Sequence, residues 1–144
     1  MCNHCPYVVH LLEPLICVAR RYQKQGIAFI AVSSNDITTH PQDAPECMAQ
    51  LGKEMNFPFP YCYDETQDVA RAYHAACTPD FFLFNAEHRL VYRGQFDVSR
   101  PGNRIPVNGA QLTAALDHVI SGTPLTEPQH PSMGCNIKWR SSLS

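Results

Sequence analysis

The chain begins MCNHCPYVVH (residues 1–10), and this stretch contains two cysteines, Cys2 and Cys5, with His4 between them. A proline follows the second cysteine, which is acceptable in the first turn of a helix. Apolar residues then recur every three or four positions, so the pattern from Asn3 to about Gln25 predicts a helix. Its apolar face is predicted to consist of Val9, Leu12, Ile16 and Ala19. The Cys-x-x-Cys pair is therefore expected at a helix N-terminus.

A cysteine pair in that position has a specific chemical use. Exposed backbone N–H groups and the positive end of the helix stabilise a thiolate, so we expect Cys2 to be nucleophilic near neutral pH. Cys5 lies one turn further in, where it can close a disulfide and release a mixed-disulfide partner. An imidazolium at His4 favours the reduced form of the pair and makes its disulfide a stronger oxidant, within a range of roughly -270 to -120 mV.

The same thiols also fit half of a metal site. A structural zinc site needs four ligands, and the sequence has no second Cys-x-x-Cys pair. His74 and Cys77 would complete a Cys3His set, and copper binding by the thiols is a further alternative. Zinc binding and copper binding therefore remain alternatives to the redox function.

Composition limits the class of protein. The chain has 144 residues, of which 44% are hydrophobic and 17% charged, and a net charge of -2. This balance gives no electrostatic reason to expect nucleic acid or an anionic membrane as partner. We see no signal peptide and no apolar run near the roughly 20 residues of a membrane span. Seven cysteines are an odd number, which argues against a closed disulfide scaffold and favours reduced thiols in the cytoplasm.

The remaining pattern predicts an α/β fold with a mixed sheet. We expect one domain over residues 1–123 and an extended tail over residues 124–144, rich in proline and polar residues. The predicted elements after the first helix are a buried strand (27–35), a helix (46–55), a short strand (61–63), a helix capped by Asp64 (64–75) with Val69, Ala70 and Tyr73 inward, a hairpin (81–85 and 90–96) and a last helix (109–121).

Four blocks together resemble a known family. They are CNHCP (2–6), ACTPDFFLFN (76–85), VYRGQFDVSRPGN (91–103) and PSMGCNIKW (131–139). In combination they resemble the peroxiredoxin-like redoxins, an AhpC/TSA-related group of the thioredoxin-like superfamily, over essentially the whole chain.

The resemblance implies a thioredoxin-like fold with Cys2 as nucleophile and Cys5 as its resolving partner. It also implies that Thr78–Pro79 is a cis-proline turn that faces the disulfide and pairs with the backbone of an extended substrate. No organic cofactor or metal is required. The expected partners are protein or small-molecule thiols and disulfides.

The sequence departs from the pattern of this family at the start of the chain. Thioredoxin-like folds place a central strand directly before the cysteine motif, and here that strand is missing. Unpaired buried backbone groups cost ~1–3 kcal/mol each, against a total stability of roughly 5–15 kcal/mol. We expect a start site assigned to an internal methionine, a fragment, or other strands that close the gap.

Two further cysteines are candidate redox thiols. Cys77, near the proline turn, is either a third redox thiol or a small buried residue. Cys135 either folds back as a second resolving thiol or belongs to a tail that packs Trp139 on the domain. The other three, Cys17, Cys47 and Cys62, are expected to be core or surface thiols.

The sequence therefore predicts a thiol–disulfide oxidoreductase that uses Cys2 and Cys5, with His4 setting the potential and Thr78–Pro79 orienting the partner. Three alternatives remain. One is a thiol peroxidase, although the usual Pro-x-x-x-Thr-x-x-Cys stretch has no place before Cys2. The others are a metal-binding or metal-delivery module and a truncated inactive chain. Oligomeric state stays open.

Overall fold

Four α-helices and six short strands alternate along residues 1–142, the part of the chain that the computed structural model describes. The helices are α1 (Pro6–Gln23), α2 (Pro45–Glu54), α3 (Asp68–Ala72) and α4 (Ala110–Ser121), with a 3-10 turn at Pro41–Asp43. The strands are β1 (Ala31–Ser33), β2 (Tyr61–Tyr63), β3 (Cys77–Thr78), β4 (Phe81–Phe84), β5 (Leu90–Gly94) and β6 (Cys135–Asn136). The predicted mixed α/β class is confirmed.

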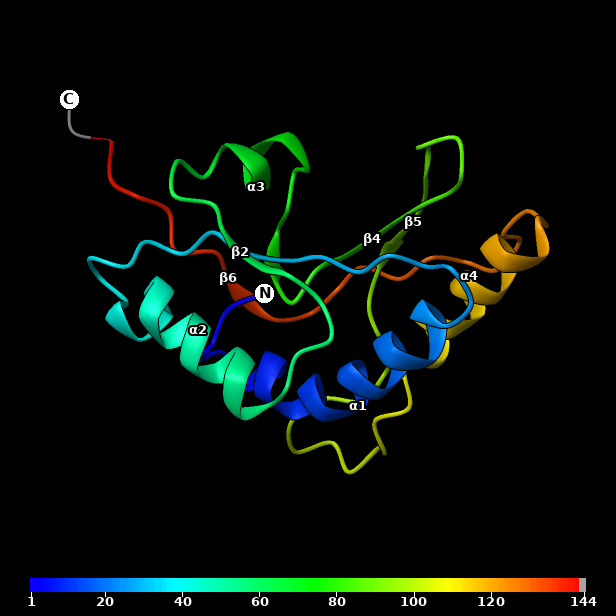
Figure 1. The fold of residues 1–144 in the computed structure, drawn as a ribbon, viewed down its shortest axis with the longest axis horizontal. Helices are drawn as coiled ribbons and strands as arrows, with labels where there is room; N and C mark the ends of the chain where they lie inside the picture. The colour runs from blue at the N-terminus through cyan, green and yellow to red at the C-terminus, as the bar shows by residue number, and fades with distance from the viewer. Residues whose placement is uncertain (143–144) are drawn as a thin grey trace.

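The strands form three two-stranded sheets. β1 and β2 are parallel, whereas β4 pairs with β5 and β3 pairs with β6 in antiparallel fashion. The pairs cross the middle of the molecule, with α1, α2 and α4 on one side and α3 on the other (Figure 1). Within residues 1–142 the strands form these three separate pairs and no continuous central sheet.

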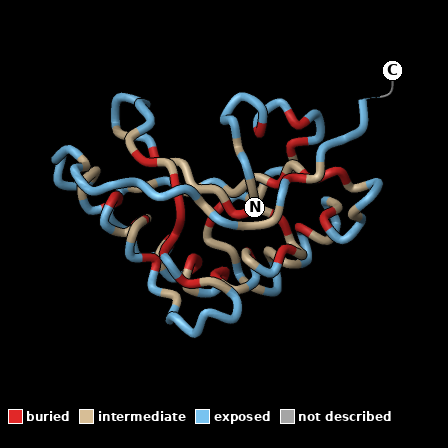
Figure 2. Tube along the Cα trace, turned by 180° about the vertical axis from the view of Figure 1, so that it is seen from behind, coloured by how far each residue is buried: buried red, intermediate tan, exposed pale blue. Residues whose placement is uncertain are grey.

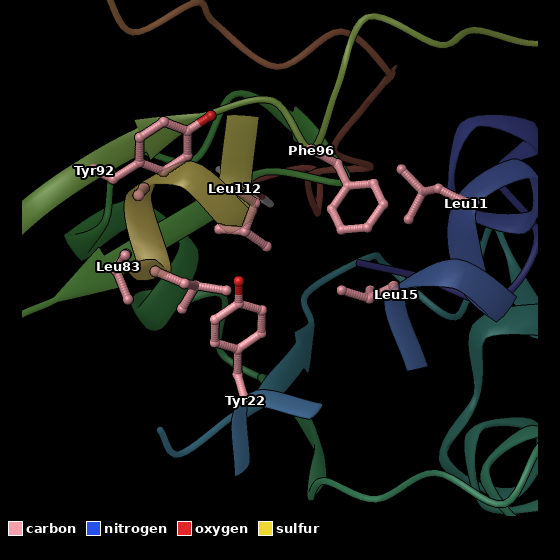
Figure 3. Close-up of a cluster of buried hydrophobic side chains, with 9 residues drawn as sticks. Leu11, Leu15, Tyr22, Leu83, Tyr92, Phe96 and Leu112 are labelled. Atoms are coloured by element: carbon pink, nitrogen blue, oxygen red, sulfur yellow. The ribbon is translucent and has the colours of Figure 1, made fainter. Parts of the chain in front are cut away.

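The larger core lies between α1, α4 and the β4–β5 hairpin. In Figure 3, Phe96 points toward Leu11 of α1. Gly109 starts α4 at a φ of +65°, and a Cβ there would lie 2.6 Å from the Phe96 ring, so only glycine fits this close approach. The buried members of this core are Leu11, Leu15, Tyr22, Leu83, Tyr92, Phe96, Leu112, Ala115 and Leu116.

A second core lies on the other side of α1. Leu12, Ile16 and Ala19 are buried there against Phe59. Helix α1 is therefore buried along two faces. Figure 2 shows the same pattern for the whole chain, with buried residues (red) in the interior and exposed residues (pale blue) at the loop tips. Val9, which the spacing placed on the apolar face, is 59% exposed, so that part of the prediction is wrong.

Two predicted elements are shorter in the structure. The strand predicted over residues 27–35 is reduced to β1. The predicted helix over residues 64–75 is reduced to α3, and Val69 and Tyr73 are exposed instead of inward. The N-cap residue of α3 is Gln67 and not Asp64 as predicted, although the Asp64 carboxylate does accept hydrogen bonds from the Val69 and Ala70 N–H groups (3.3 and 2.9 Å).

The segment after α4 packs along the body of the domain. The Gln95 N–H donates to His130 O (3.0 Å), and Ser132 Oγ donates to Gly94 O (2.6 Å). Further on, the buried Gln67 side chain donates to Lys138 O (2.9 Å). The tail is thus attached at several points between residues 129 and 140. Of the helices in residues 1–142, none has both the length and the apolar composition of a membrane span.

Candidate active site

The two N-terminal cysteines lie at the start of α1, and both are fully buried. The helix begins at Pro6, with Cys5 as its N-cap residue, whose carbonyl accepts from Val8 N–H (2.9 Å) and Val9 N–H (3.0 Å). Cys2 lies in the segment before the helix. The predicted placement of Cys2 at the helix N-terminus is therefore wrong, because the proline ring, which lacks an N–H and fixes φ, sets the first helical position at Pro6.

The turn at Thr78 faces both cysteines. Cys2 Sγ lies 3.7 Å from Thr78 Oγ1, and Cys5 Sγ lies 3.3 Å from Thr78 O. The Thr78–Pro79 peptide bond is cis, as the resemblance implied. Four of the predicted site residues, at positions 2, 5, 78 and 79, are thus brought together although more than 70 residues separate the two segments.

The thiol pair shares one negative charge unequally. The Cys2 side chain, which hydrogen-bonds the Cys5 sulfur, lowers the pKa of Cys5 to about 4, and Cys135 and Thr78 act in the same direction against burial. The pKa of Cys2 is raised far above its usual range by the contact with Cys5, by burial and by the Asp43 charge. The two shifts have opposite directions, which makes Cys5 the more acidic thiol of the pair. The sequence analysis expected the more acidic thiol at Cys2, because it placed the helix start at Asn3, whereas the helix begins at Pro6.

His4 contacts a buried carboxylate. Its Nδ1 lies 2.6 Å from Asp43 Oδ2, and its ring stacks on His40 at 5.3 Å between centroids. Asp43 is fully buried and accepts hydrogen bonds from the Asn3 N–H (2.8 Å) and from Asn35 Nδ2 (3.0 Å). The Asp43 carboxylate thus orients His4 beside the cysteine pair.

Sequence reasoning missed Asp43. It lies in a proline-containing loop without hydrophobic periodicity, 38 residues after Cys5 in sequence, so no local pattern marks it. Ligand atoms of Cys2, His4 and Asp43 lie within 4.8 Å of one another. Among residues 1–142 this is the one group of three such side chains, and His74 and Cys77 are not in it. The alternative Cys3His zinc set is therefore not assembled within residues 1–142.

The tail reaches the same site. Cys135 Sγ lies 2.7 Å from Cys5 Sγ. β6 pairs with β3 so that Cys135 is opposite Thr78, and a Cβ at Gly134 would lie only 1.9 Å from Thr78 O. The β3 edge, which the resemblance assigned to an extended substrate, is therefore occupied by this chain's own tail. Sequence reasoning left Cys135 open because nothing local predicts this pairing.

Of the other cysteines, Cys77 lies on the β3–β6 ladder next to Thr78, and the remaining three are elsewhere in the domain. Cys77 is half-buried, its sulfur lies 3.6 Å from Pro79 O, and burial raises its pKa to about 11. Cys17 and Cys62 are exposed and Cys47 is half-buried, as expected of core or surface thiols. Trp139 is 44% exposed, with the Arg71 guanidinium 5.1 Å above its ring.

A cysteine pair at the start of a helix, packed against a turn between two strands in an α/β domain, defines a thioredoxin-like redoxin. The chain belongs to the AhpC/TSA family, whose model matches residues 1–93. This family comprises thiol-dependent oxidoreductases and peroxidases, so the protein is an oxidoreductase at this general level.

Two solved structures are similar over 99% of the chain. One is an uncharacterized conserved protein from Geobacillus kaustophilus, 51% identical, with a TM-score of 0.96 and 75% of its own length covered. The other is a hypothetical protein from Sinorhizobium meliloti 1021, 48% identical, with a TM-score of 0.97 and 78% of its length covered. No curated protein matches the chain.

Proposed function

We propose that the protein is a thiol–disulfide oxidoreductase in which Cys2 and Cys5 exchange disulfides with protein or small-molecule partners. The observation that carries the proposal is the shared charge of two buried sulfurs that both contact Thr78. Such a pair supplies one thiolate and one thiol at neutral pH, as disulfide exchange requires.

In the first step Cys2 attacks the substrate disulfide. Its proton passes to the neighbouring Cys5 thiolate, a Cys2–substrate bond forms, and the substrate's other sulfur leaves as a thiolate. That thiolate takes the proton from Cys5. Cys2 is assigned the attack because the Cys5 sulfur already contacts Cys135 and the Thr78 carbonyl, whereas the hydrogen bond of the Cys2 sulfur outside the pair is to the Thr78 hydroxyl.

In the second step the Cys5 thiolate attacks the Cys2 sulfur. The Cys2–substrate bond breaks, a Cys2–Cys5 disulfide forms, and the second substrate sulfur leaves as a thiolate. The substrate is thereby reduced and the chain oxidised by two electrons. His4 and Asp43 lie beside Cys2 and fix the surroundings of its sulfur during both steps, while the Asp43 charge disfavours a thiolate at Cys2.

Access to the pair requires a local movement. Both cysteines are fully buried, and the segment around Gly134 lies directly against Thr78. A substrate must therefore displace part of this segment. Displacing the segment near residue 134 breaks the short β3–β6 pairing, which is a local opening and not global unfolding.

The test is turnover of a model disulfide, oxidised glutathione, with dithiothreitol as electron donor. We expect C2S to abolish turnover and C5S to trap a glutathione–Cys2 mixed disulfide, visible as a mass increase of the intact protein. C47S, at a half-buried thiol away from the pair, serves as the matched control and should retain the full rate.

Retention of turnover by C2S would contradict the proposal. Replacing the disulfide with hydrogen peroxide tests the peroxidase alternative. If peroxide, and not the disulfide, consumes dithiothreitol in a Cys2-dependent manner, the chain is a thiol peroxidase.

The cluster of Cys2, His4 and Asp43 favours a second candidate, a metal-binding module. Thiolate, imidazole and carboxylate are all zinc ligands. The Asp43 carboxylate already has three close partners, so a metal ion must displace His4 from it. If the protein is a metal-binding module, protein purified without chelator should contain one equivalent of metal. Cys2 should then be protected from alkylation until chelator is added.

A further inference from the structure

Cys5 lies between two possible sulfur partners. Cys2 is close enough to hydrogen-bond it, and Cys135 Sγ lies 2.7 Å away on the opposite end of the chain. The proposed exchange uses only the first of these contacts. The second is built by three separate features: the β3–β6 pairing, the glycine that allows the backbones to touch, and the hydrogen bonds that attach the tail on both sides of residue 135.

The pairing has the form of a bound substrate. Within a redoxin site the strand edge beside the turn is where an extended partner chain adds its backbone. Here β6 occupies that edge with Cys135 opposite Thr78, so a cysteine of this chain lies where the reacting cysteine of a partner would lie.

We propose that Cys135 is a third redox thiol, which receives the disulfide from the Cys2–Cys5 pair and joins the tail covalently to the site. This inference rests on the proposed function of that pair. The stable oxidised form is then the Cys5–Cys135 disulfide, with Cys2 returned to the thiol state and ready for another exchange.

The step is an internal thiol–disulfide exchange and needs no further oxidant. The Cys135 sulfur attacks Cys5, the Cys2–Cys5 bond breaks, and the Cys5–Cys135 bond forms. The proton of Cys135 passes to the departing Cys2 sulfur. The oxidising equivalents come entirely from the substrate disulfide that Cys2 reduced.

The charges at the site give this step its order. In the reduced protein, burial together with the Cys5 hydrogen bond and charge raises the pKa of Cys135 to about 11, so Cys135 stays a thiol. Formation of the Cys2–Cys5 disulfide removes the Cys5 charge. Cys135 then loses its proton more easily, at the moment when its target sulfur has become electrophilic.

The cleavage sites of trypsin make the two disulfides easy to distinguish. Cys2 and Cys5 both lie in the peptide that ends at Arg20, whereas Cys135 lies in the peptide from Ile105 to Lys138. A Cys2–Cys5 bond is therefore internal to one peptide, and a Cys5–Cys135 bond links two. The C17S background removes the exposed third cysteine of the first peptide.

The experiment treats reduced C17S protein with excess oxidised glutathione, quenches samples with acid over time, alkylates them with N-ethylmaleimide and maps the peptides. We expect the internal disulfide to appear first and then decline as the linked peptides accumulate, with N-ethylmaleimide on Cys2. C17S/C77S is the matched control, since Cys77 lies on the same β3–β6 ladder and contacts Pro79 O. It should behave as C17S does.

The outcomes separate the two proposals. If the internal Cys2–Cys5 disulfide is the end state and Cys135 carries N-ethylmaleimide throughout, the Cys135 inference is overturned while the proposed function stands. If C17S/C135S forms no Cys2–Cys5 disulfide and shows no turnover, the proposed function itself fails. If C17S/C2S forms the linked peptides as fast as C17S, the disulfide does not come through Cys2 and the relay is refuted.

Discussion

The contact between the tail and the site depends on a missing side chain at residue 134, and the variant Gly134→Ala tests it. An alanine Cβ would lie 1.9 Å from Thr78 O and 2.7 Å from Thr78 C. Both neighbours are backbone atoms that cannot rotate away. Since carbon and oxygen do not approach below about 3 Å, the two segments must separate by roughly 1 Å.

That separation has two measurable consequences. The β3–β6 ladder weakens, and each backbone hydrogen bond lost costs ~0.5–1.5 kcal/mol, so we expect the free energy of unfolding to fall by about 1–3 kcal/mol. A misplacement of ~1 Å between reacting groups reduces a rate by about 10²-fold. Formation of the Cys5–Cys135 disulfide should therefore slow by that factor, while formation of the Cys2–Cys5 disulfide keeps its rate.

The assay is the time course of linked and internal tryptic peptides, together with denaturant unfolding and the alkylation rate of Cys135 in the reduced protein. Gly52→Ala is the matched control, because a Cβ there meets only the Phe57 ring at 3.4 Å and improves a position inside α2. If Gly134→Ala forms the linked peptides at the wild-type rate and its Cys135 is alkylated no faster, the tail does not position Cys135 in the way the structure indicates.

Three other predictions concern the charges and the attachment of the tail. Asp43→Asn removes a buried charge that raises the pKa of Cys2, so alkylation of Cys2 should shift to lower pH, with a stability loss of ~1–3 kcal/mol because the new amide faces the donors of Asn3 and Asn35. The lowered pKa of Cys5 means that folded protein carries a thiolate between about pH 4 and pH 9 where unfolded protein carries a thiol. The contribution of this thiolate to the free energy of unfolding is therefore full above pH 9 and is lost as the pH falls toward 4. We expect the thiolate absorbance and the free energy of unfolding to change across this range in the wild type and not in C5S. Gln67→Ala removes hydrogen bonds to Lys138 O and from Arg140 N–H, so proteolysis after these two residues should accelerate, whereas cleavage at Arg104 serves as the internal reference and should be unchanged.

Local signals predicted the elements whose ends are marked by specific residues. The last helix was predicted within one residue of α4, whose N-cap is Gly109 and whose C-cap is Gly122, and the Asn108 side chain accepts from the Ala110 N–H. The hairpin of β4 and β5 was likewise recognised from two apolar runs around a polar turn. Such signals work because the stabilising contacts lie within a few residues of each other in sequence.

The candidate site was only partly predictable for the opposite reason. The Cys-x-x-Cys pattern identified the two sulfurs, and the resemblance identified Thr78 and Pro79. The partners that distribute the charge, Asp43 and Cys135, come from a loop and a tail whose positions depend on tertiary contacts alone. The predicted helix start at Asn3 instead of Pro6 also affected the expectation for the cysteine pair, since it put Cys2 and not Cys5 next to the first helical turn.

Thr78 connects these parts of the site. Its hydroxyl contacts the Cys2 sulfur, its carbonyl contacts the Cys5 sulfur, and its backbone is paired opposite Cys135 on β6. A movement of this one turn therefore changes the surroundings of all three sulfurs together. Because the tail must leave β3 for a partner chain to pair there, binding of an extended substrate and contact of Cys135 with Cys5 exclude each other. Under the proposed relay the tail takes up the disulfide only after the substrate has departed, which separates reduction of the substrate from internal transfer of the disulfide.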